Sequence, residues 1–443
     1  MKKTFSRNTS RRDFVKGTGL MAGGILAAPL LSRANFFSGA DDTIKIAVVG
    51  CGGRGTGAAM QALSCKQNVK IVAMADAFKD NLDNCHKSLT DEINNSIGEL
   101  AKRLDVPEER RFTGFDGYQK AIALADVVIL ATPPGFRPIH FAEAIKQGKH
   151  VFMEKPVATD PAGIQSVLAT AAIAKEKKLN VVVGLQRHYQ NSYRELYKRK
   201  DMIGDITSAQ AWWDNDGVWV RPRKYNQTEM EYQMRNWYYF NWLCGDHITE
   251  QHIHNLDVIN WFKGGHPIKA QGFGGRQVRK GKDHGEIFDH HFVEFEYADG
   301  SILNSQCRHI PGTMSKVDEL LIGTKGKIFC GAAHIKDHSG KIIYQYDTKL
   351  ENNPYQSEHD ELFAAIAKGE YKFADAENGA SSTMTSIMGR MATYSGQIIE
   401  WDKAINSGID IHPKKYDWNA EPPVMPNADG YYPIAIPGVT KYF

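Results

Sequence analysis

The sequence predicts an α/β protein of two domains, a first domain with a parallel sheet and an α/β domain with a large, mostly antiparallel open sheet. Short apolar strands alternate with helical segments over residues 43–184, which is typical of a parallel sheet with crossover helices. From residue 206 onward the strands are longer and alternate strictly between apolar and polar side chains, which favours an antiparallel sheet with one solvated or interface-forming face. A length of 443 residues agrees with two domains rather than one.

The first strand runs into a glycine-rich turn. Ile44 to Val49 is rich in β-branched residues and ends in Gly50-x-Gly52-x-x-Gly55, after which an apolar run continues as a helix. Glycines let the backbone approach a pyrophosphate closely, and the helix N-terminus offers it free N–H groups. Asp76 ends the second strand about 20 residues further on, where an acid reads the adenine ribose hydroxyls. The pattern predicts a Rossmann domain that binds NAD, with NADP disfavoured because Asp76 repels a 2′-phosphate. The alternative is a tight turn without a ligand.

Further helices and strands complete the first domain. The expected helices lie at residues 81–104, 139–147 and 162–178, and the expected strands at residues 125–131, 150–153 and 180–184. A turn-rich connection is expected at residues 112–118, and Asp160 before Pro161 is a helix start signal. In a parallel sheet the strand ends at Gly50, Thr132 and Glu154 meet at one edge, where the ligand of such a sheet binds.

The second half contains the antiparallel strands. They are expected at residues 208–214, 270–273, 291–297, 301–307, 319–322 and 327–329. Asp299-Gly300 between two of them is typical of a tight hairpin turn. Residues 413–443 are rich in proline, tyrosine and asparagine, which predicts an extended arm on the body or on a neighbouring subunit. The expected divisions of the chain are residues 1–40, 41–184, 185–412 and 413–443.

Residues 1–40 are predicted to be an export signal and linker. Ser10-Arg11-Arg12-Asp13-Phe14-Val15-Lys16 is a twin-arginine sequence, and the glycine- and alanine-rich stretch after it is too short to span a membrane. The alternative is a basic tail with a chance arginine pair. The twin-arginine machinery carries folded proteins to the periplasm, so we expect a cofactor that is loaded before export and stays tightly bound. The cleavage site is left open.

Composition narrows the class of protein. The formal net charge is +3, the basic residues of the predicted signal account for that surplus, and no basic stripe indicates binding to nucleic acid. The six cysteines form no C-x-x-C pair or Cys/His cluster that would indicate zinc, and the spacing leaves open whether any disulfide forms. Beyond the signal, no apolar run is long enough to span a membrane.

Several motifs together resemble a known family. They are the glycine turn, Ala131-Thr132-Pro133-Pro134 with His140, Glu154-Lys155-Pro156, and His254-x-x-Asp257 on a later helix. Over residues 43–400 the chain resembles the glucose–fructose oxidoreductase / inositol dehydrogenase / MocA (Gfo/Idh/MocA) family. The resemblance implies a Rossmann domain followed by an α/β domain whose open sheet joins subunits, and therefore a homo-oligomer, a dimer or tetramer. It also implies hydride transfer between a sugar-like C–OH group and NAD(P).

The resemblance also implies roles for single residues. The catalytic lysine of the family matches Lys155 and its histidine matches His254, whereas Glu250 stands where the family has aspartate and His252 where it has glycine. Those two departures would reshape the pocket, so the particular substrate is left open. The cofactor-binding residues that the motifs imply are Gly50, Gly52, Gly53, Arg54, Gly55, Asp76, Thr132, Pro133, His140, Glu154 and Lys155.

The same residues make chemical sense without the family. His254 suits a general base because its unperturbed pKa is nearest neutrality, and Lys155 beside the nicotinamide would polarise the developing carbonyl oxygen. Glu250, His254 and Asp257 share one helix face, so Glu250 could orient His254 or hold a sugar hydroxyl. Asp257 could contact the substrate or only anchor the helix. Such a face could bind a divalent metal, but lysine–nicotinamide chemistry needs none, and no metal is expected.

Candidate substrate contacts lie elsewhere in the chain. Arg187 and His188 follow a strand end and would either face the crevice or solvent. Trp237 belongs to a dense aromatic region just ahead of the catalytic helix. Aromatic faces stack on sugar rings, so this region predicts either a carbohydrate pocket or a core between the domains.

Three functions are therefore considered. The leading one is an exported NAD-dependent oxidoreductase acting on a sugar-like secondary alcohol. The second is a redox-neutral, NAD-dependent glycoside hydrolase, which oxidises the sugar, eliminates the aglycone, adds water and reduces the sugar again. The α-N-acetylgalactosaminidases of the resembling family work in this way but depart from the Glu-Lys-Pro motif. The third is a non-catalytic sugar- or NAD-binding protein, which intact Lys155 and His254 disfavour.

Overall fold

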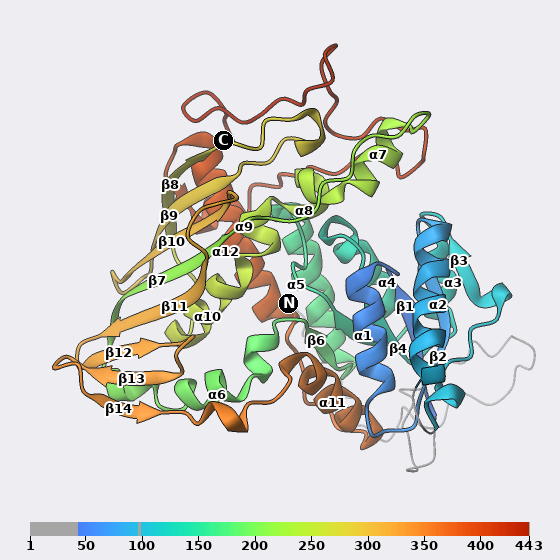
Figure 1. The fold of residues 1–443 in the computed structure, drawn as a ribbon, viewed down its shortest axis with the longest axis horizontal. Coiled ribbons are helices and arrows are strands. Elements are labelled where there is room, and N and C mark those ends of the chain that lie inside the picture. Colours follow the sequence, from blue (N-terminus) through green and yellow to red (C-terminus); the bar gives the residue numbers. More distant parts are fainter. Residues whose placement is uncertain (1–42, 96–98, 443) are drawn as a thin grey trace, which may run out of the picture. The chain divides into compact units, whose positions relative to one another are not determined.

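The computed structural model describes residues 43–95 and 99–442, so the predicted export signal lies outside the described residues. Six parallel strands form the first sheet in the order β3-β2-β1-β4-β5-β6 (Figure 1). Their bounds are β1 Ile44–Val49, β2 Val69–Asp76, β3 Arg111–Thr113, β4 Val127–Leu130, β5 His150–Met153 and β6 Val181–Val183. This order with parallel pairing is that of a Rossmann-like sheet, as expected.

The helices between these strands agree with the expected positions, apart from the segment expected as one helix over residues 81–104 and apart from α3, which was not expected. Their bounds are α1 Gly53–Leu63, α2 Lys79–Asn95, α3 Gly117–Ala123, α4 Arg137–Lys146 and α5 Pro161–Glu176. The Asp160 carboxylate accepts a hydrogen bond from Gly163 N at 2.7 Å, which confirms the start signal of α5. The expected single helix over residues 81–104 is wrong, because α2 ends at Asn95 and a 3₁₀ turn occupies Glu99–Arg103.

The connection at residues 112–118 also differs from the expectation. It contains β3 and the first turn of α3, not only turns. β3 pairs with the end of β2, where Ala75 lies opposite Phe112. A three-residue strand depends on such an edge partner, and no local pattern marks it.

The second sheet has nine strands in the order β14-β13-β12-β11-β7-β10-β9-β8-β15. All neighbours are antiparallel except β10 and β7. The bounds are β7 Ile206–Asn215, β8 Lys269–Gly275, β9 His290–Glu296, β10 Ile302–His309, β11 Lys316–Gly323, β12 Gly326–Phe329, β13 His334–Asp337, β14 Ile342–Gln345 and β15 Ile399–Glu400. The six expected strands and the Asp299-Gly300 hairpin are confirmed. β13, β14 and β15 were missed because each is at most 4 residues long.

The remaining helices connect and cover these sheets (Figure 1). They are α6 Asn191–Tyr197, α7 Glu229–Arg235, α8 Asn241–Cys244, α9 His247–Glu250, α10 Ile253–Lys263, α11 Pro354–Ala367, α12 Ala376–Ser395 and α13 Trp401–Ile405. Helix α10 packs on β7 and β11, and α12 packs on β8 and β9 of the same sheet. The α12 helix also packs on α5, which follows the first sheet, so it joins both parts of the fold.

One helix from late in the chain completes the first domain. Helix α11 packs against α1, and its Leu362 and Phe363 are fully buried in the same apolar cluster as Ile46 and Val48 of β1. Burying two such side chains stabilises the first sheet by roughly 3–6 kcal/mol. The first sheet therefore depends on residues about 180 positions after its last strand in the sequence, a separation that local periodicity does not reveal.

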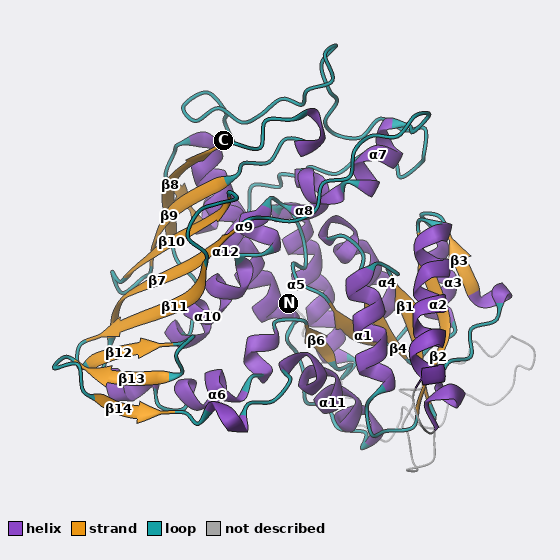
Figure 2. Cartoon of the chain, in the orientation of Figure 1, coloured by secondary structure: helices purple, strands orange, loops and turns teal. Residues whose placement is uncertain are grey.

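The described part of the C-terminal arm, residues 413–442, contains no helix or strand and runs as loops and turns (Figure 2). It lies on the body of its own chain. The Trp418 ring packs 4.5 Å from Phe115 and 5.1 Å from Phe78, and Gln233 Nε2 donates to Val424 O at 2.7 Å.

Two further observations concern the whole described chain. Across residues 43–95 and 99–442, no helix is long and apolar enough to cross a membrane. The six cysteines are all buried and unpaired, so none forms a disulfide.

The glycine turn generates a stability prediction. A methyl group added to Gly55 would lie 1.8 Å from the carbonyl oxygen of Gly50, whereas one added to Gly53 would meet nothing within 4 Å. We expect Gly55→Ala to lower the free energy of unfolding by about 2 kcal/mol or more, because the clash is with backbone. Gly53→Ala, in the first turn of the same helix, should leave it unchanged or raise it slightly. Equal denaturant midpoints for the two variants would contradict this packing.

Candidate functional site

One cavity of about 480 Å³ lies at the carboxyl ends of the parallel strands. Gly50, Asp76, Thr132 and Glu154 line it from the ends of β1, β2, β4 and β5, and His254 lines it from α10 of the second part of the chain. The volume falls in the range of about 300–1,000 Å³ that is typical of ligand sites. The strand-end alignment expected from the sequence is therefore present.

The glycine turn forms one end of the cavity. Gly50 has a φ of +94°, and a methyl group there would lie 2.4 Å from Thr132 N, so this position requires glycine. Gly52 and Gly53 line the cavity, and methyl groups on them would point into open space. Free space above the N-terminus of α1 is what a bound pyrophosphate needs. Gly55 does not line the cavity, since it packs under Gly50 and lets helix and strand approach.

Asp76 is held at the cavity by its own neighbours. Its Oδ2 accepts from Cys51 N at 2.7 Å, and its Oδ1 accepts from Phe78 N at 2.8 Å and from Asn81 Nδ2 at 3.3 Å. Burial raises the pKa of Asp76, and the bonds from Phe78 and Cys51 partly offset that. The carboxylate is thus oriented by backbone N–H groups at the position expected to read ribose hydroxyls.

A buried arginine organises the end of β4. Arg137 is 1% exposed and donates to Leu130 O and Thr132 O, each at 2.7 Å. Thr132 Oγ1 lies 3.1 Å from His140 Nδ1, and both residues line the cavity with Pro133. Burial, followed by the charge of Arg137, lowers the pKa of His140 to about 3, so the imidazole is neutral. The sequence missed Arg137, because a basic residue in a first helical turn predicts solvent exposure.

Glu154 faces two charged neighbours. Arg54 Nε donates to Glu154 Oε1 at 2.5 Å, and its guanidinium lies over the Tyr355 ring. Glu358 of α11 is fully buried nearby, and burial, followed by the charge of Glu154, raises its pKa well above the usual value. Arg54 therefore stands between two carboxyl groups at the wall of the cavity, and the long-range partner Glu358 could not be found from the motif alone.

Lys155 is joined to the second domain. Its Nζ donates to the backbone oxygen of Glu250 at 2.5 Å and lies 3.2 Å from Glu250 Oε1. Both side chains are about one-tenth exposed, at 10% each, and both line the cavity. Burial raises the pKa of Glu250, although the charge of Lys155 opposes the shift. An ammonium in this position can polarise a carbonyl oxygen in the cavity.

His254 lies in the same cavity as Lys155. Its ring stacks on Trp213 at a centroid distance of 5.9 Å, and its buried Nδ1 has no hydrogen-bond partner among the described residues. Burial, with the positive charges of Lys155 and Arg187, holds its pKa well below the ordinary value. The imidazole is therefore neutral and able to accept a proton.

Aromatic side chains form the wall beyond these groups. Trp213, Trp219, Trp237 and Tyr238 all line the cavity. Trp219 is 40% exposed and meets Trp237 edge-on at 5.8 Å. This arrangement offers ring faces at the open end of the cavity, as carbohydrate binding requires, and it includes the expected Trp237.

Arg187, His188 and Asp257, expected as substrate contacts, do not line the cavity. Arg187 is held by a buried ion pair with Glu319, so its guanidinium is engaged by that carboxylate. His188 Nε2 lies 2.8 Å from Asp257 Oδ2, and Asp257 Oδ1 accepts from Ser382 Oγ at 2.8 Å. These residues form a supporting layer behind α10, so Asp257 anchors that helix, the second of the two roles considered for it.

Other lining residues were not expected from the sequence. They include Phe78, Asn81, Phe115, Tyr118, Phe136, Gln186, Arg221, Met234, Arg235 and Gln251. Only Gln186, next to a strand end, carried a usable signal; the others come from loops and helices that tertiary packing brings together.

A family of NAD-binding proteins matches the part of the chain that forms the cavity at the strand ends. Residues 44–185 match the family model described as oxidoreductase family, NAD-binding Rossmann fold, which is the Gfo/Idh/MocA family. The first domain is therefore similar to the NAD-binding Rossmann domains of this family, which agrees with the expected cofactor, NAD.

Relatives of known name cover more of the chain. Inositol 2-dehydrogenase of Cereibacter sphaeroides is 23% identical over 78% of this chain and 92% of its own length, and that of Gluconacetobacter diazotrophicus is 26% identical over 55% and 61%. This chain matches two of the most similar curated relatives over only 43% and 61% of their own length. Scyllo-inositol dehydrogenase of Lactobacillus casei, solved with NAD(H) and scyllo-inositol, shares the fold with a TM-score of 0.60 at 21% identity, over 82% of this chain and all (100%) of that one.

The buried imidazole generates a pH prediction. The unfolded chain has a histidine pKa of about 6.5, above that of folded His254, so below pH 6.5 the unfolded state binds more protons. The free energy of unfolding should therefore fall on acidification by up to about 1.4 kcal/mol per pH unit more in the wild type than in His254→Gln. Urea unfolding of both proteins at pH 7.5, 6.5 and 5.5 measures the difference. If the free energy of unfolding changed with pH in the same way in both proteins, a lowered pKa of His254 in the folded state would be excluded.

Proposed function

We propose that this protein is an exported, NAD-dependent oxidoreductase that transfers hydride between a sugar-like secondary alcohol and a tightly bound cofactor. The observation that carries the proposal is the shared cavity. The glycine turn, Lys155 and His254 all line it, although they come from both halves of the chain. A protein that only bound NAD or sugar would not need a buried lysine and a neutral histidine there.

The residues divide the chemistry between them. When bound, NAD supplies the acceptor for the hydride that leaves the alcohol carbon. The imidazole of His254 takes the hydroxyl proton, which its lowered pKa permits at neutral pH. Lys155 stabilises the oxygen as its negative charge develops, and Glu250 holds Lys155 in place through the 2.5 Å bond to its backbone oxygen.

The substrate class follows from the wall of the cavity. Trp213, Trp219, Trp237 and Tyr238 present ring faces beside the catalytic pair. Inositol 2-dehydrogenases recur among the relatives, and inositols are ring polyols like sugars. A cyclic polyol or sugar therefore suits both the aromatic wall and the relatives, while the departures at Glu250 and His252 leave the particular compound open.

The C-terminal arm supports a retained cofactor. Trp418 packs on Phe78 and Phe115, which line the cavity near Asp76, and Tyr416 packs on Phe136 at 5.2 Å. By packing on these lining residues, the arm would restrain the wall of the cavity and so favour retention of a bound cofactor. Retention would suit a periplasmic enzyme, which meets no free NAD pool and must regenerate its cofactor in place, for example by reducing a second carbonyl compound.

Redox-neutral glycoside cleavage is a second candidate, favoured by one observation. Glu250 is a buried carboxyl group with a raised pKa in the same cavity, and its Oε2 has no hydrogen-bond partner among the described residues. Elimination next to an oxidised carbon needs a second group able to exchange a proton, and Glu250 could supply it. Release of an aglycone without accumulation of NADH would identify this reaction.

We also propose that the second sheet joins subunits. Phe273 of β8 is 66% exposed and stacks on Phe292 of β9 at 5.2 Å, so an apolar surface lies on the face of the sheet. Light scattering of the purified protein should give the mass of a dimer or tetramer, and a monomer would exclude this role.

The central prediction concerns Lys155. Lys155→Ala should lower turnover by about 10³-fold while NAD remains bound, because the phosphates are held at the glycine turn. His254→Ala should lose about 10²–10⁴-fold as the general base. Exposed Lys146→Ala serves as the control and should retain full activity. Mass spectrometry of undialysed protein measures the cofactor, and a screen of sugars, inositols and aryl glycosides measures turnover.

The outcomes of that screen separate the functions. NADH formation that depends on a polyol or sugar supports the oxidoreductase, whereas released aglycone supports the hydrolase. Wild-type rates in Lys155→Ala, or bound NADP in place of NAD, would contradict the proposal. Absence of any turnover or hydride exchange would favour a binding protein.

Export generates a separate prediction. Arg11 and Arg12 lie outside the described residues, so this proposal rests on the sequence motif. Replacing both with lysine should trap folded, NAD-loaded protein in the cytoplasm, whereas the native pair should deliver it to the periplasm. Cell fractionation with cofactor analysis of each fraction is the measurement. Undiminished export of the lysine pair would indicate an unfolded-chain route and remove the argument for a permanently bound cofactor.

A further inference from the structure

A cluster of buried histidines lies outside the cavity described above. Asp246 and His247 stand at the start of α9, and His291 comes from β9 of the second sheet. None of the three lines the cavity. They are 0%, 0% and 2% exposed, so the cluster is sealed from solvent in the interior of the second domain.

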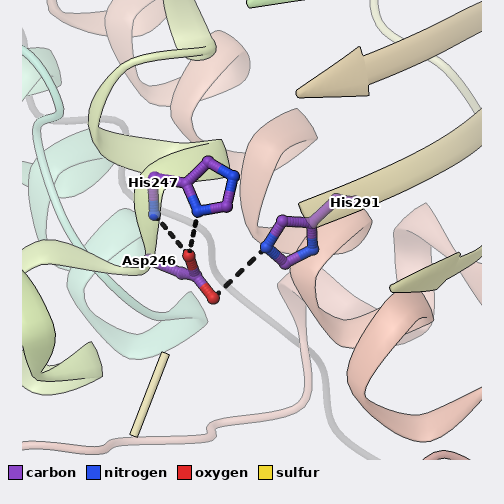
Figure 3. Close-up of side chains that lie close together, drawn as sticks. All are labelled: Asp246, His247 and His291. Carbon is purple, nitrogen blue, oxygen red and sulfur yellow. Dashed lines mark hydrogen bonds and ion pairs between the residues drawn. The ribbon is translucent and has the colours of Figure 1, made fainter. Parts of the chain in front are cut away.

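The two imidazoles face the same carboxylate (Figure 3). His247 Nδ1 lies 2.8 Å from Asp246 Oδ1, and His291 Nε2 lies 3.3 Å from Asp246 Oδ2. One ligand atom from each residue lies within 4.8 Å of the other two. Two imidazole nitrogens and a carboxylate oxygen at these separations match the ligand set and spacing of a divalent transition-metal site.

The nitrogens are unsatisfied in spite of their burial. His247 Nδ1 and Nε2 and His291 Nε2 have no hydrogen-bond partner among the described residues, and the approaches of His247 Nδ1 and His291 Nε2 to Asp246 are ion-pair contacts. A buried polar atom without a partner costs roughly 1–3 kcal/mol. An ion between the three side chains would satisfy two of these nitrogens at once.

Hydrogen bonds from neighbouring residues already orient the side chains of Asp246 and His291. His291 Nδ1 lies 2.9 Å from Thr393 Oγ1 of α12, which leaves Nε2 directed at Asp246. Asp246 Oδ2 accepts from Tyr394 O–H at 2.6 Å and from Phe288 N at 3.0 Å. Metal-ligating histidines characteristically use their second nitrogen in this way, and their carboxylate ligands are hydrogen-bonded in turn.

We propose that Asp246, His247 and His291 form a buried structural site for one divalent transition-metal ion, with Zn²⁺ as the expected occupant. Imidazole and carboxylate ligands suit Zn²⁺, and these side chains supply three of the four ligands that it usually takes. The lack of solvent exposure suits a structural rather than a catalytic ion. Because the site has no solvent exposure, the ion enters as the chain folds. The expectation of no metal rested on the lack of a Cys/His cluster along the sequence and on lysine–nicotinamide chemistry that needs none. Neither argument registers ligands on separate elements such as α9 and β9.

The site would stabilise the turn that carries Glu250. Asp246 adopts a φ of +71°, which is unusual for a residue other than glycine, and α9 begins directly after it. Glu250 ends α9 and binds Lys155. An ion at Asp246 would therefore hold this backbone conformation one helical turn away from the Lys155 contact, without taking part in the chemistry of the cavity.

Metal content tests the proposal directly. Untagged full-length protein, produced in zinc-supplemented medium and desalted, should contain about one equivalent of zinc per chain by inductively coupled plasma mass spectrometry. His291→Gln should lose the metal. His290→Gln is the matched control, because the neighbouring His290 side chain is 34% exposed and pairs with Asp289 instead, and it should keep the full equivalent.

Two further measurements remain decisive if His291→Gln fails to fold. Wild-type protein unfolded with chelator and refolded with Co²⁺ should show the visible absorption of a four- or five-coordinate Co²⁺ site, and refolding with Zn²⁺ should raise its melting temperature. Thr393→Val, which removes only the outer partner of His291, should weaken Zn²⁺ binding by about 10–100-fold.

The opposite results would overturn the proposal. Wild-type protein with less than roughly a tenth of an equivalent of any transition metal, and no Co²⁺ absorption after refolding, would show that the cluster is a metal-free polar core. Full zinc occupancy in His291→Gln would place the ion elsewhere. Equal Zn²⁺ affinity in Thr393→Val and wild type would contradict the assigned ligand geometry.

Discussion

The candidate site depends above all on the contact of Lys155 with Glu250, which joins the two halves of the chain. Lys155 follows β5 of the parallel sheet, and Glu250 ends α9 just before the helix that carries His254. The 2.5 Å bond from Lys155 Nζ to the Glu250 backbone oxygen therefore fixes the distance between a strand end and a helix. Because both side chains are nearly buried, the pair must stay intact, since a lone buried charge would be strongly destabilising.

Helix α12 maintains this contact from behind. It packs on α5 of the first domain and on β8 and β9 of the second sheet. Thr383 Oγ1 accepts from Val157 N at 3.2 Å, and Arg390 donates to Thr159 O at 2.7 Å, so the segment that follows Lys155 is bonded to the helix. Helix α12 thereby holds the segment after Lys155 against the sheet on which α10 packs. These bonds limit relative motion of the two domains at the cavity.

Buried charge on the other side of α10 has a positioning role. Arg187 pairs with Glu319 of β11, and Asn255 of α10 donates to the same carboxylate at 2.6 Å. Asp257 binds His188 and Ser382 two residues further along the helix. Such networks contribute little net stability compared with apolar packing, but they allow only one register of the helix. They therefore determine where His254 points, and they do so without touching the substrate.

Much of this protein was readable from local sequence. The strand, glycine turn and acid from Ile44 to Asp76, the strand ends at Thr132 and Glu154, and the alternating strands of the second sheet were all predicted, because each depends on periodicity or on a backbone requirement within a few residues. The same holds for Lys155 and His254 as members of one site, since their motifs mark a strand end and a helix face. For Arg187 and His188 the local signal was a strand end alone, which does not reveal a buried partner.

What only the tertiary structure decided involves residues that are distant in sequence. Glu319 pairs with Arg187, α11 covers the first sheet, and His291 comes to face Asp246 and His247. The sequence by itself determined the two sheets, the NAD-binding turn and the catalytic candidates, because those follow from local backbone geometry and side-chain periodicity. The partners of buried charges were decided by the tertiary structure, because a buried polar group is satisfied by whichever group packing brings to it, and that choice leaves no pattern along the chain.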